Sequence, residues 1–139
     1  MAVYTHLSDK EIRNFLTEYD IGQLLDFSEI AEGVENSNFL LTTSSDKYIL
    51  TLYEKRVDPH DLPFFLKLLS HLASARLTSP LPVEGIDGNA LRTLGGKPAA
   101  IVTYLQGSWP RQTTLDHCKA LGSTMAIMHE FGKSFQGTR

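Results

Sequence analysis

The sequence predicts an α+β fold in which one mostly antiparallel sheet of about five strands carries an inserted helix. Apolar and polar residues alternate with a period of two in three consecutive segments, 26–33, 38–44 and 47–54, with polar turns between them. Apolar residues then recur at spacings of three and four over residues 60–75, which predicts a helix. Three strands followed by a helix do not suit a doubly wound parallel sheet.

A short helix is predicted before the first strand. Ser8 and Glu11 have the spacing of a capping box, and apolar residues follow them at helical intervals. We therefore expect this helix to begin near Asp9 and to end around residues 20–22.

The region 77–98 contains several proline and glycine residues, which leave room only for short strands at 83–86 and 90–94. The next segment, 98–105, is almost continuously apolar, as is typical of a strand that is central in its sheet. A linker at 108–112 follows this strand.

The final helix is predicted over residues 113–131, because Thr113 and Asp116 have capping spacing. An apolar stripe then runs along one side of this helix, made of Leu115, Cys118, Leu121, Met125 and Met128. An exposed stripe of this length needs a partner. We expect it either to fold back on the sheet or to contact a second copy of the chain.

Composition narrows the classes of function. The net charge of −3 lacks the basic excess of nucleic-acid binders and of polybasic membrane-binding proteins, so we expect neither partner. Cys118 is the only cysteine, which excludes an internal disulfide and a CxxC site. The histidines share no ligand spacing, so no metal site is expected. The absence of a signal peptide and of a membrane-length apolar run indicates a cytoplasmic location.

The turn between the first two strands is longer and more polar than a tight hairpin needs. From Gly33 onward it offers backbone N–H groups, and Asn36, Ser37 and Asn38 add neutral side-chain donors. Such a set of donors suits phosphate oxygens. Glycine, asparagine and serine are also ordinary turn residues, so a longer hairpin loop without a ligand is the alternative.

Alternation along the third strand predicts that Ile49, Thr51 and Lys55 share one face, which is available to a ligand. The alternative is that Lys55 only solubilises the end of the strand. Residues 102–107 leave the sheet as an extended segment, whose backbone groups suit the edge of a planar heterocycle. An ordinary strand end is again the alternative.

Five segments, in this order, resemble the aminoglycoside-phosphotransferase-like kinases, and within that superfamily most closely the homoserine kinases of the kinase-like type. They are residues 30–42, 48–58, 61–65, 102–107 and 121–129. The resemblance implies a protein-kinase-like amino-terminal, nucleotide-binding lobe at 1–107. It also implies a linker and the first helix of an incomplete carboxy-terminal lobe at 108–139.

The resemblance further implies roles for individual residues. Residues Gly33 to Asn38 correspond to the loop that covers the nucleotide phosphates. Ile30, Leu40 and Ile49 correspond to an apolar surface over adenine, and Tyr104, Leu105 and Gln106 to the hinge that binds the base. The implied cofactors are ATP and Mg²⁺. The implied acceptor is L-homoserine, whose hydroxyl is phosphorylated in threonine biosynthesis.

Two departures from the family pattern concern the phosphate site. Thr51 stands where many relatives place a lysine or arginine, and the helix at 60–75 contains no glutamate to pair with one. Either Lys55 supplies the charge, or Mg²⁺ and loop amides carry it. The sequence also lacks the His-Gly-Asp…Asn catalytic loop of relatives, so we expect no catalytic residue in this chain and no turnover by the chain alone. The alternatives are a kinase for choline, methylthioribose or aminoglycosides, and a non-catalytic nucleotide-binding or interaction module.

Overall fold

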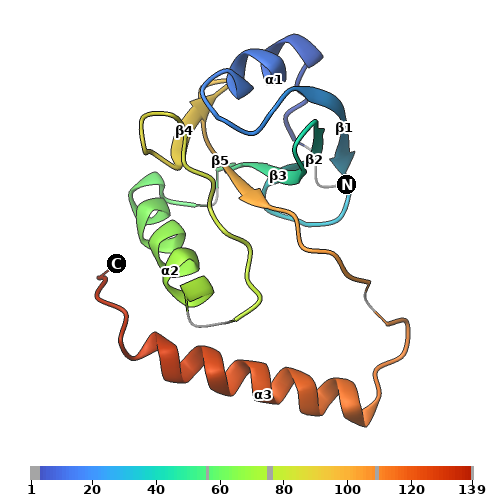
Figure 1. Cartoon of the computed structure of the whole chain (residues 1–139), viewed down its shortest axis with the longest axis vertical. Helices are drawn as coiled ribbons and strands as arrows, with labels where there is room; N and C mark the ends of the chain where they lie inside the picture. Colours follow the sequence, from blue (N-terminus) through green and yellow to red (C-terminus); the bar gives the residue numbers. More distant parts are fainter. Residues whose placement is uncertain (1–3, 56, 75–76, 109, 139) are drawn as a thin grey trace.

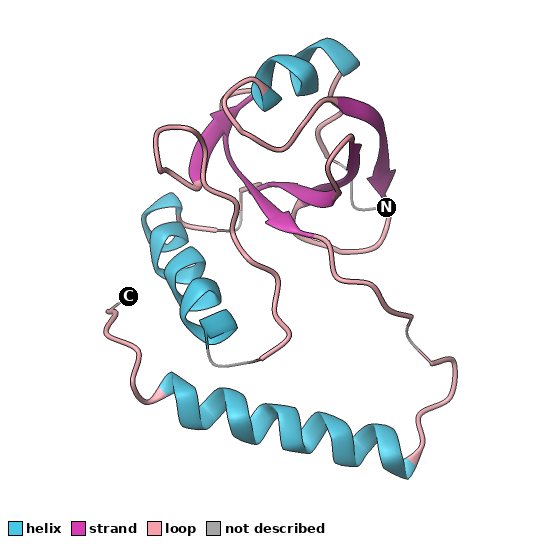
Figure 2. Ribbon diagram, in the orientation of Figure 1, coloured by secondary structure: helices cyan, strands magenta, loops and turns pink. Residues whose placement is uncertain are grey.

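The computed structural model describes residues 4–55, 57–74, 77–108 and 110–138 (Figure 1). The helices and strands, shown in Figure 2, are α1 (Asp9–Leu16), β1 (Leu24–Ile30), β2 (Ser37–Thr43), β3 (Lys47–Leu52), the 3₁₀ turn η1 (Pro59–Asp61), α2 (Leu62–Ser74), β4 (Leu91–Leu94), β5 (Lys97–Thr103) and α3 (Leu115–Gly132). Within the described part of the chain, no helix combines the length and apolarity that crossing a membrane requires.

The strands form one five-stranded sheet in the order β1-β2-β3-β5-β4, and every neighbouring pair is antiparallel. The predicted α+β fold is thereby confirmed, including the helix inserted between the third strand and the rest of the sheet. Strand β5 lies between β3 and β4, as its continuous apolar sequence predicted.

The main core lies between α1 and one face of the sheet. The predicted capping box is confirmed: the Ser8 hydroxyl accepts a hydrogen bond from Glu11 N, and the Glu11 carboxylate accepts one from Ser8 N. The apolar side of α1 is buried against sheet residues in a cluster that includes Ile12, Phe15, Phe39, Leu50 and Ile101. Burying one such side chain stabilises the fold by about 1.5–3 kcal/mol. Figure 1 shows α1 above the sheet and α2 below it.

The predicted end of α1 and the predicted strand at 83–86 were wrong, and β1 and β3 end at Ile30 and Leu52 rather than at residues 33 and 54. Helix α1 ends at Leu16, where Thr17 caps it, so the turn before β1 is longer than the apolar spacing indicated. The segment 83–86 is not a strand, and only an isolated bridge joins Pro82 to Val102. Hydrogen bonds from Val83 N to the Ile101 carbonyl at 2.8 Å and from Thr103 N to the Leu81 carbonyl at 2.9 Å flank this bridge, and no strand continues beyond it.

Helix α3 is capped one residue later than predicted. The Thr114 hydroxyl accepts from His117 N, and the His117 ring accepts from Thr114 N, so the pair is Thr114 and His117 rather than Thr113 and Asp116. No described residue of α3 is buried, and Leu115 and Leu121 are 88% and 61% exposed. The expectation that the stripe folds back on the sheet was therefore wrong. Near its end α3 meets α2, where the His71 ring hydrogen-bonds the Phe131 carbonyl at 3.0 Å.

Candidate functional site

The sheet register brings together the predicted adenine-contacting residues on one face. Leu40 lies opposite Ile49, which in turn lies opposite Val102 on β5. Ile30 lies opposite Asn38 and continues the same face at the end of β1. These side chains are half-buried and face away from the α1 core, because the residues between them fill that core. We call Ile30, Asn38, Leu40, Ile49, Thr51 and Val102 the open face.

Asn38 and Thr51 form the polar end of the open face. They lie directly opposite each other on β2 and β3, and the Thr51 hydroxyl donates to the Asn38 carboxamide oxygen at 2.8 Å. This bond uses the oxygen of the carboxamide, so its NH₂ group is the part that can donate to an anion. Thr51 and Asn38 thus form a neutral hydrogen-bonded pair at this end of the open face.

Residues 31–36 connect β1 to β2 beside that polar end. Gly33 has φ of 121°, a conformation that side chains rarely adopt, so the loop needs glycine there. Val34 is exposed, whereas Asn36 turns inward and accepts a hydrogen bond from Glu54 N at 3.4 Å. The loop is therefore held at its second half and exposed near its tip.

The Ser37 side chain does not lie where the sequence placed it. Ser37 is fully buried on the α1 side of the sheet, and its hydroxyl donates to Glu54 Oε1 at 2.7 Å. The Ser37 hydroxyl oxygen in turn accepts from the backbone N–H groups of Tyr4 and Thr5 at 2.9 and 3.1 Å. The Ser37 hydroxyl is thus engaged with protein groups on the α1 side, and of the three predicted donors only Asn38 lies on the open face.

Glu54 is the centre of this buried network. Its carboxylate accepts from Thr5 Oγ1 at 2.8 Å and pairs with the Lys97 ammonium. Burial alone raises the pKa of Glu54, but hydrogen bonds from Lys97, Ser37 and Thr5 hold that pKa below its ordinary value of 4.5. Thr5, Glu54 and Lys97 could not be identified from the sequence, because no local spacing links positions so far apart in the chain.

Lys55 lies beyond the last residue of β3, Leu52, so strand alternation does not place it on the open face. It is exposed and lines a hollow of about 400 Å³ together with Tyr4, Val34, Glu35, Glu54 and Lys97. The predicted position of Lys55 on the Ile49 face was therefore wrong, although the residue does lie beside the loop that follows β1.

The predicted hinge leaves the sheet directly beside the open face. Tyr104 N donates to the Lys47 carbonyl at 3.2 Å, which prolongs the pairing of β3 with β5 by one bond. Tyr104 and Leu105 are then 37% and 40% exposed, and Gln106 is exposed as well. Residues 104–106 thus leave the sheet at the Lys47 end of β3, whereas loop 31–36 lies at its Leu52 end, and the open face extends between them.

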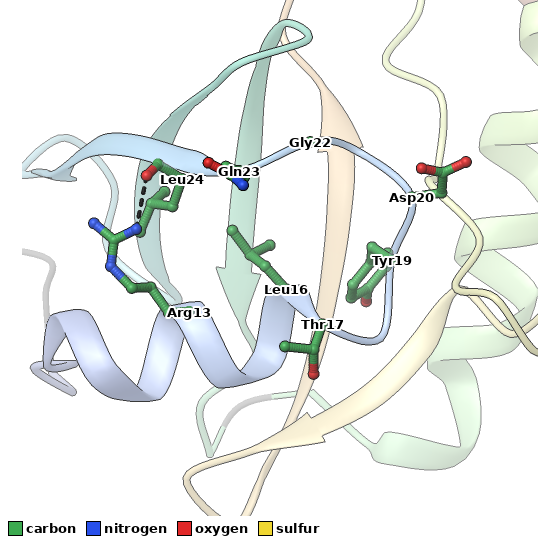
Figure 3. A pocket seen from close by; sticks show the side chains of 8 residues that line it. All are labelled: Arg13, Leu16, Thr17, Tyr19, Asp20, Gly22, Gln23 and Leu24. Carbon is green, nitrogen blue, oxygen red and sulfur yellow. Dashed lines mark hydrogen bonds between the residues drawn. The ribbon is translucent and has the colours of Figure 1, made fainter.

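A different hollow, of about 410 Å³, lies between the end of α1 and the start of β1 (Figure 3). Arg13 bridges its two walls by donating to the Leu24 carbonyl at 2.8 Å. The buried Tyr19 ring lies on another side of it, and burial raises the pKa of this phenol to about 12. This hollow is on the α1 side of the sheet and so is separate from the open face.

Comparison with known sequences gives the family. Residues 26–139 match the family described as "Phosphotransferase enzyme family". The chain is 58% identical over 139 residues to a homoserine kinase from Paramagnetospirillum magneticum, covering all of this chain and 43% of that protein. It is 56% identical over 135 residues to a homoserine kinase from Bradyrhizobium diazoefficiens, covering 97% of this chain and 41% of that protein. The chain thus spans less than half the length of these curated relatives.

Solved structures show the same fold. A spectinomycin phosphotransferase, in complex with ADP and spectinomycin, matches with a TM-score of 0.71 at 14% identity over 91% of this chain and 39% of that one. A microcompartment-associated aminopropanol kinase matches with a TM-score of 0.69 at 22% identity over 94% of this chain and 42% of that one. The fold is therefore kinase-like, and the chain belongs to the phosphotransferase enzyme family.

Proposed function

We propose that this chain is the nucleotide-binding part of a homoserine kinase. The observation that carries the proposal is the open face, which ends at a glycine-containing loop on one side and at the exposed segment 104–106 on another. The identity to proteins named homoserine kinase supports the choice of acceptor. In this proposal, residues 1–107 form the nucleotide lobe, and 108–139 form a linker and the first helix of a second lobe.

ATP fits the chemistry of this surface. Ile30, Leu40 and Ile49 supply an apolar surface for the base, and the backbone after Tyr104 supplies hydrogen-bonding groups for its edge. The Asn38 carboxamide and the amides of residues 33–36 supply neutral donors for phosphates. Mg²⁺ bound to the phosphates would offset the charge that these donors leave unbalanced.

Lys55 is the proposed protein cation for the phosphates. It approaches from the hollow beside Val34 and Glu35 rather than from the open face. A hydrogen bond to a charged group contributes about 1.5–3 kcal/mol, so its loss should weaken ATP binding without abolishing it. The alternative is that Mg²⁺ and the loop amides balance the phosphate charge without Lys55.

The proposed reaction moves the γ-phosphoryl group of ATP to the side-chain hydroxyl of L-homoserine. The bond between the β–γ bridging oxygen and the γ-phosphorus breaks, a bond from phosphorus to the homoserine oxygen forms, and the hydroxyl proton passes through a general base to water. The products are ADP and O-phospho-L-homoserine. We propose that this chain binds nucleotide but does not turn over by itself, because its sequence has no His-Gly-Asp…Asn segment to act as base and metal ligand. Use of ATP also supports a cytoplasmic location.

Isothermal titration of the chain with ATP, ADP and adenosine tests the proposed binding. We expect all three to bind, with the affinity rising as phosphates are added in the presence of Mg²⁺. A coupled assay with ATP and homoserine, run on the chain and on a full-length relative, tests the acceptor and the lack of turnover. Turnover by the chain would refute the proposal that it does not turn over by itself. A different preferred acceptor in the relative would refute the homoserine assignment.

We also propose that α3 mediates self-association of this chain. The apolar stripe predicted for this helix includes Leu115, Leu121 and Met125, which are 88%, 61% and 44% exposed. A contiguous apolar surface of this kind favours association. Sedimentation velocity should show a concentration-dependent dimer that Met125→Glu abolishes, and a monomer at all concentrations would contradict the proposal.

A further inference from the structure

The segment before α1 is tied to the hairpin that carries the candidate phosphate loop. The Tyr4 hydroxyl donates to the Val34 carbonyl at 2.9 Å, which is a direct bond to the loop. The backbone N–H groups of Tyr4 and Thr5 both donate to the Ser37 hydroxyl, at the first residue of β2. Two successive residues therefore hold the loop near its tip and at its end.

The attachment continues across the sheet through Glu54. Thr5 Oγ1 donates to Glu54 Oε1, which also accepts from Ser37, and the Lys97 ammonium pairs with Glu54 Oε2. The Glu54 side chain is 9% exposed and that of Lys97 is 34% exposed, so the carboxylate is largely removed from water. A buried charge with every partner satisfied is rigid, because releasing any one partner leaves a costly unpaired group.

The network lies on the α1 side of the sheet, behind the open face. Ser37 is buried there, whereas the next residue, Asn38, points to the open face. Fixing Ser37 from behind therefore fixes the backbone from which Asn38 and the loop amides project. Asn36, which receives a hydrogen bond from Glu54 N, joins the loop to the same residue a second time.

We propose that Tyr4, Thr5, Ser37, Glu54 and Lys97 form a positioning network that holds loop 31–36 in the geometry needed for phosphate contacts. None of these side chains is assigned a contact with the nucleotide; they act through the loop backbone and Asn38. The inference rests on the proposed function, since it names what sets the phosphate affinity of that same site. The proposal gives Tyr4 and Thr5, which lie before α1 and do not border the open face, a role in ATP recognition.

Two conservative variants test the network. Tyr4→Phe removes only the hydroxyl that bonds Val34, and Tyr4 is 58% exposed, so the core is not disturbed. Thr5→Val removes the hydroxyl between Glu54 and Lys97 with little change in shape. Tyr48→Phe is the matched control, because its hydroxyl lies 3.4 Å from Ser45 Oγ at the opposite end of the β2–β3 hairpin. Thermal unfolding verifies that all three variants fold.

The first readout is hydrogen–deuterium exchange of the backbone amides of residues 33–37, which needs no ligand. Tyr4→Phe and Thr5→Val should each speed this exchange several-fold, while Tyr48→Phe leaves it unchanged. The second readout is titration with ATP–Mg²⁺ and with adenosine. Losing one hydrogen bond of positioning should weaken ATP binding by about two- to tenfold and leave adenosine binding unchanged.

Each outcome decides the proposal. Equal losses for ATP and adenosine would mean that the variants damage the whole lobe, and unchanged exchange and affinity would mean that the network positions nothing; either overturns it. If the parent chain fails to bind ATP, the proposed function fails and the phosphate role fails with it. In that case faster loop exchange would still show that the segment orders the loop, and unchanged exchange would refute that as well.

Discussion

Replacing Thr51 with lysine tests the position of the phosphate site most specifically. Thr51 lies on the open face between Asn38 and Ala100, directly opposite the proposed phosphate donor Asn38. A lysine there would extend from the same face that is proposed to bind ATP. The substitution also removes the 2.8 Å hydrogen bond from Thr51 to Asn38, which costs about 1 kcal/mol of stability.

The size of the expected effect follows from two opposing contributions. A charged hydrogen bond to phosphate contributes about 1.5–3 kcal/mol to binding. Ordering a long side chain on binding costs about 0.5–1.5 kcal/mol. The midpoints of these two ranges differ by about 1.2 kcal/mol, so Thr51→Lys should tighten ATP binding by about eightfold.

Thr51→Met is the matched control, because it loses the same hydrogen bond and adds an unbranched side chain without charge. Calorimetric titration should show tighter ATP binding for the lysine variant only, unchanged adenosine binding for both, and a gain that shrinks at high salt. Equal affinities of the lysine and methionine variants for ATP would refute the argument that the polar end of the open face lies beneath the phosphates.

Two further predictions concern the groups that hold the lobe together. The pKa of Glu54 is lower in the folded chain than its ordinary value of 4.5. The stability that ionised Glu54 contributes to the fold is therefore complete above about pH 4.5, and it is lost as the pH falls through the lower folded pKa. Glu54→Gln should therefore lower the free energy of unfolding by about 1–2 kcal/mol near neutral pH. Urea unfolding at several pH values should show this difference from the parent chain shrinking below about pH 4.5. A difference that grows as the pH falls would contradict this prediction. Arg92 pairs with the exposed carboxylates of Glu18 and Asp87 and lies 5.2 Å from the Tyr19 ring centroid. Arg92→Met should lower the free energy of unfolding by about 1–3 kcal/mol, with Arg92→Lys intermediate. A methionine variant as stable as the parent would show that this cluster contributes nothing.

The parts of the fold that local patterns determine could be predicted from the sequence. The capping box of Ser8 and Glu11 located the start of α1, and the alternation in 38–44 predicted β2, observed at Ser37–Thr43. The same alternation put Leu40 and Ile49 on one face. Errors arose where local patterns have no information about a boundary, as at Lys55, where the strand ends before the alternation does.

The positioning network and the Arg92 cluster could not be predicted, because they depend on tertiary packing. Lys97 and Thr5 are 92 positions apart, and neither belongs to a motif. Ser37 appeared to be a donor of the polar turn, but the register of β2 turns its side chain toward the core. Only the folded sheet shows which of two adjacent polar residues lies on the open face and which lies in the core. Gly85 gives a similar case, since a Cβ atom there would collide with the Arg92 guanidinium.

The central claim is that the open face and the loop beside it bind ATP. Titration of the isotope-labelled chain with ATP–Mg²⁺, followed by the NMR shifts of its backbone amides, tests this residue by residue. The account predicts saturable shifts at Gly33, Asn38, Thr51 and Leu105, with little change at Gln23 beside the α1 hollow. Shifts that cluster at residues 13–24, or no saturable shift at the open face, would contradict it.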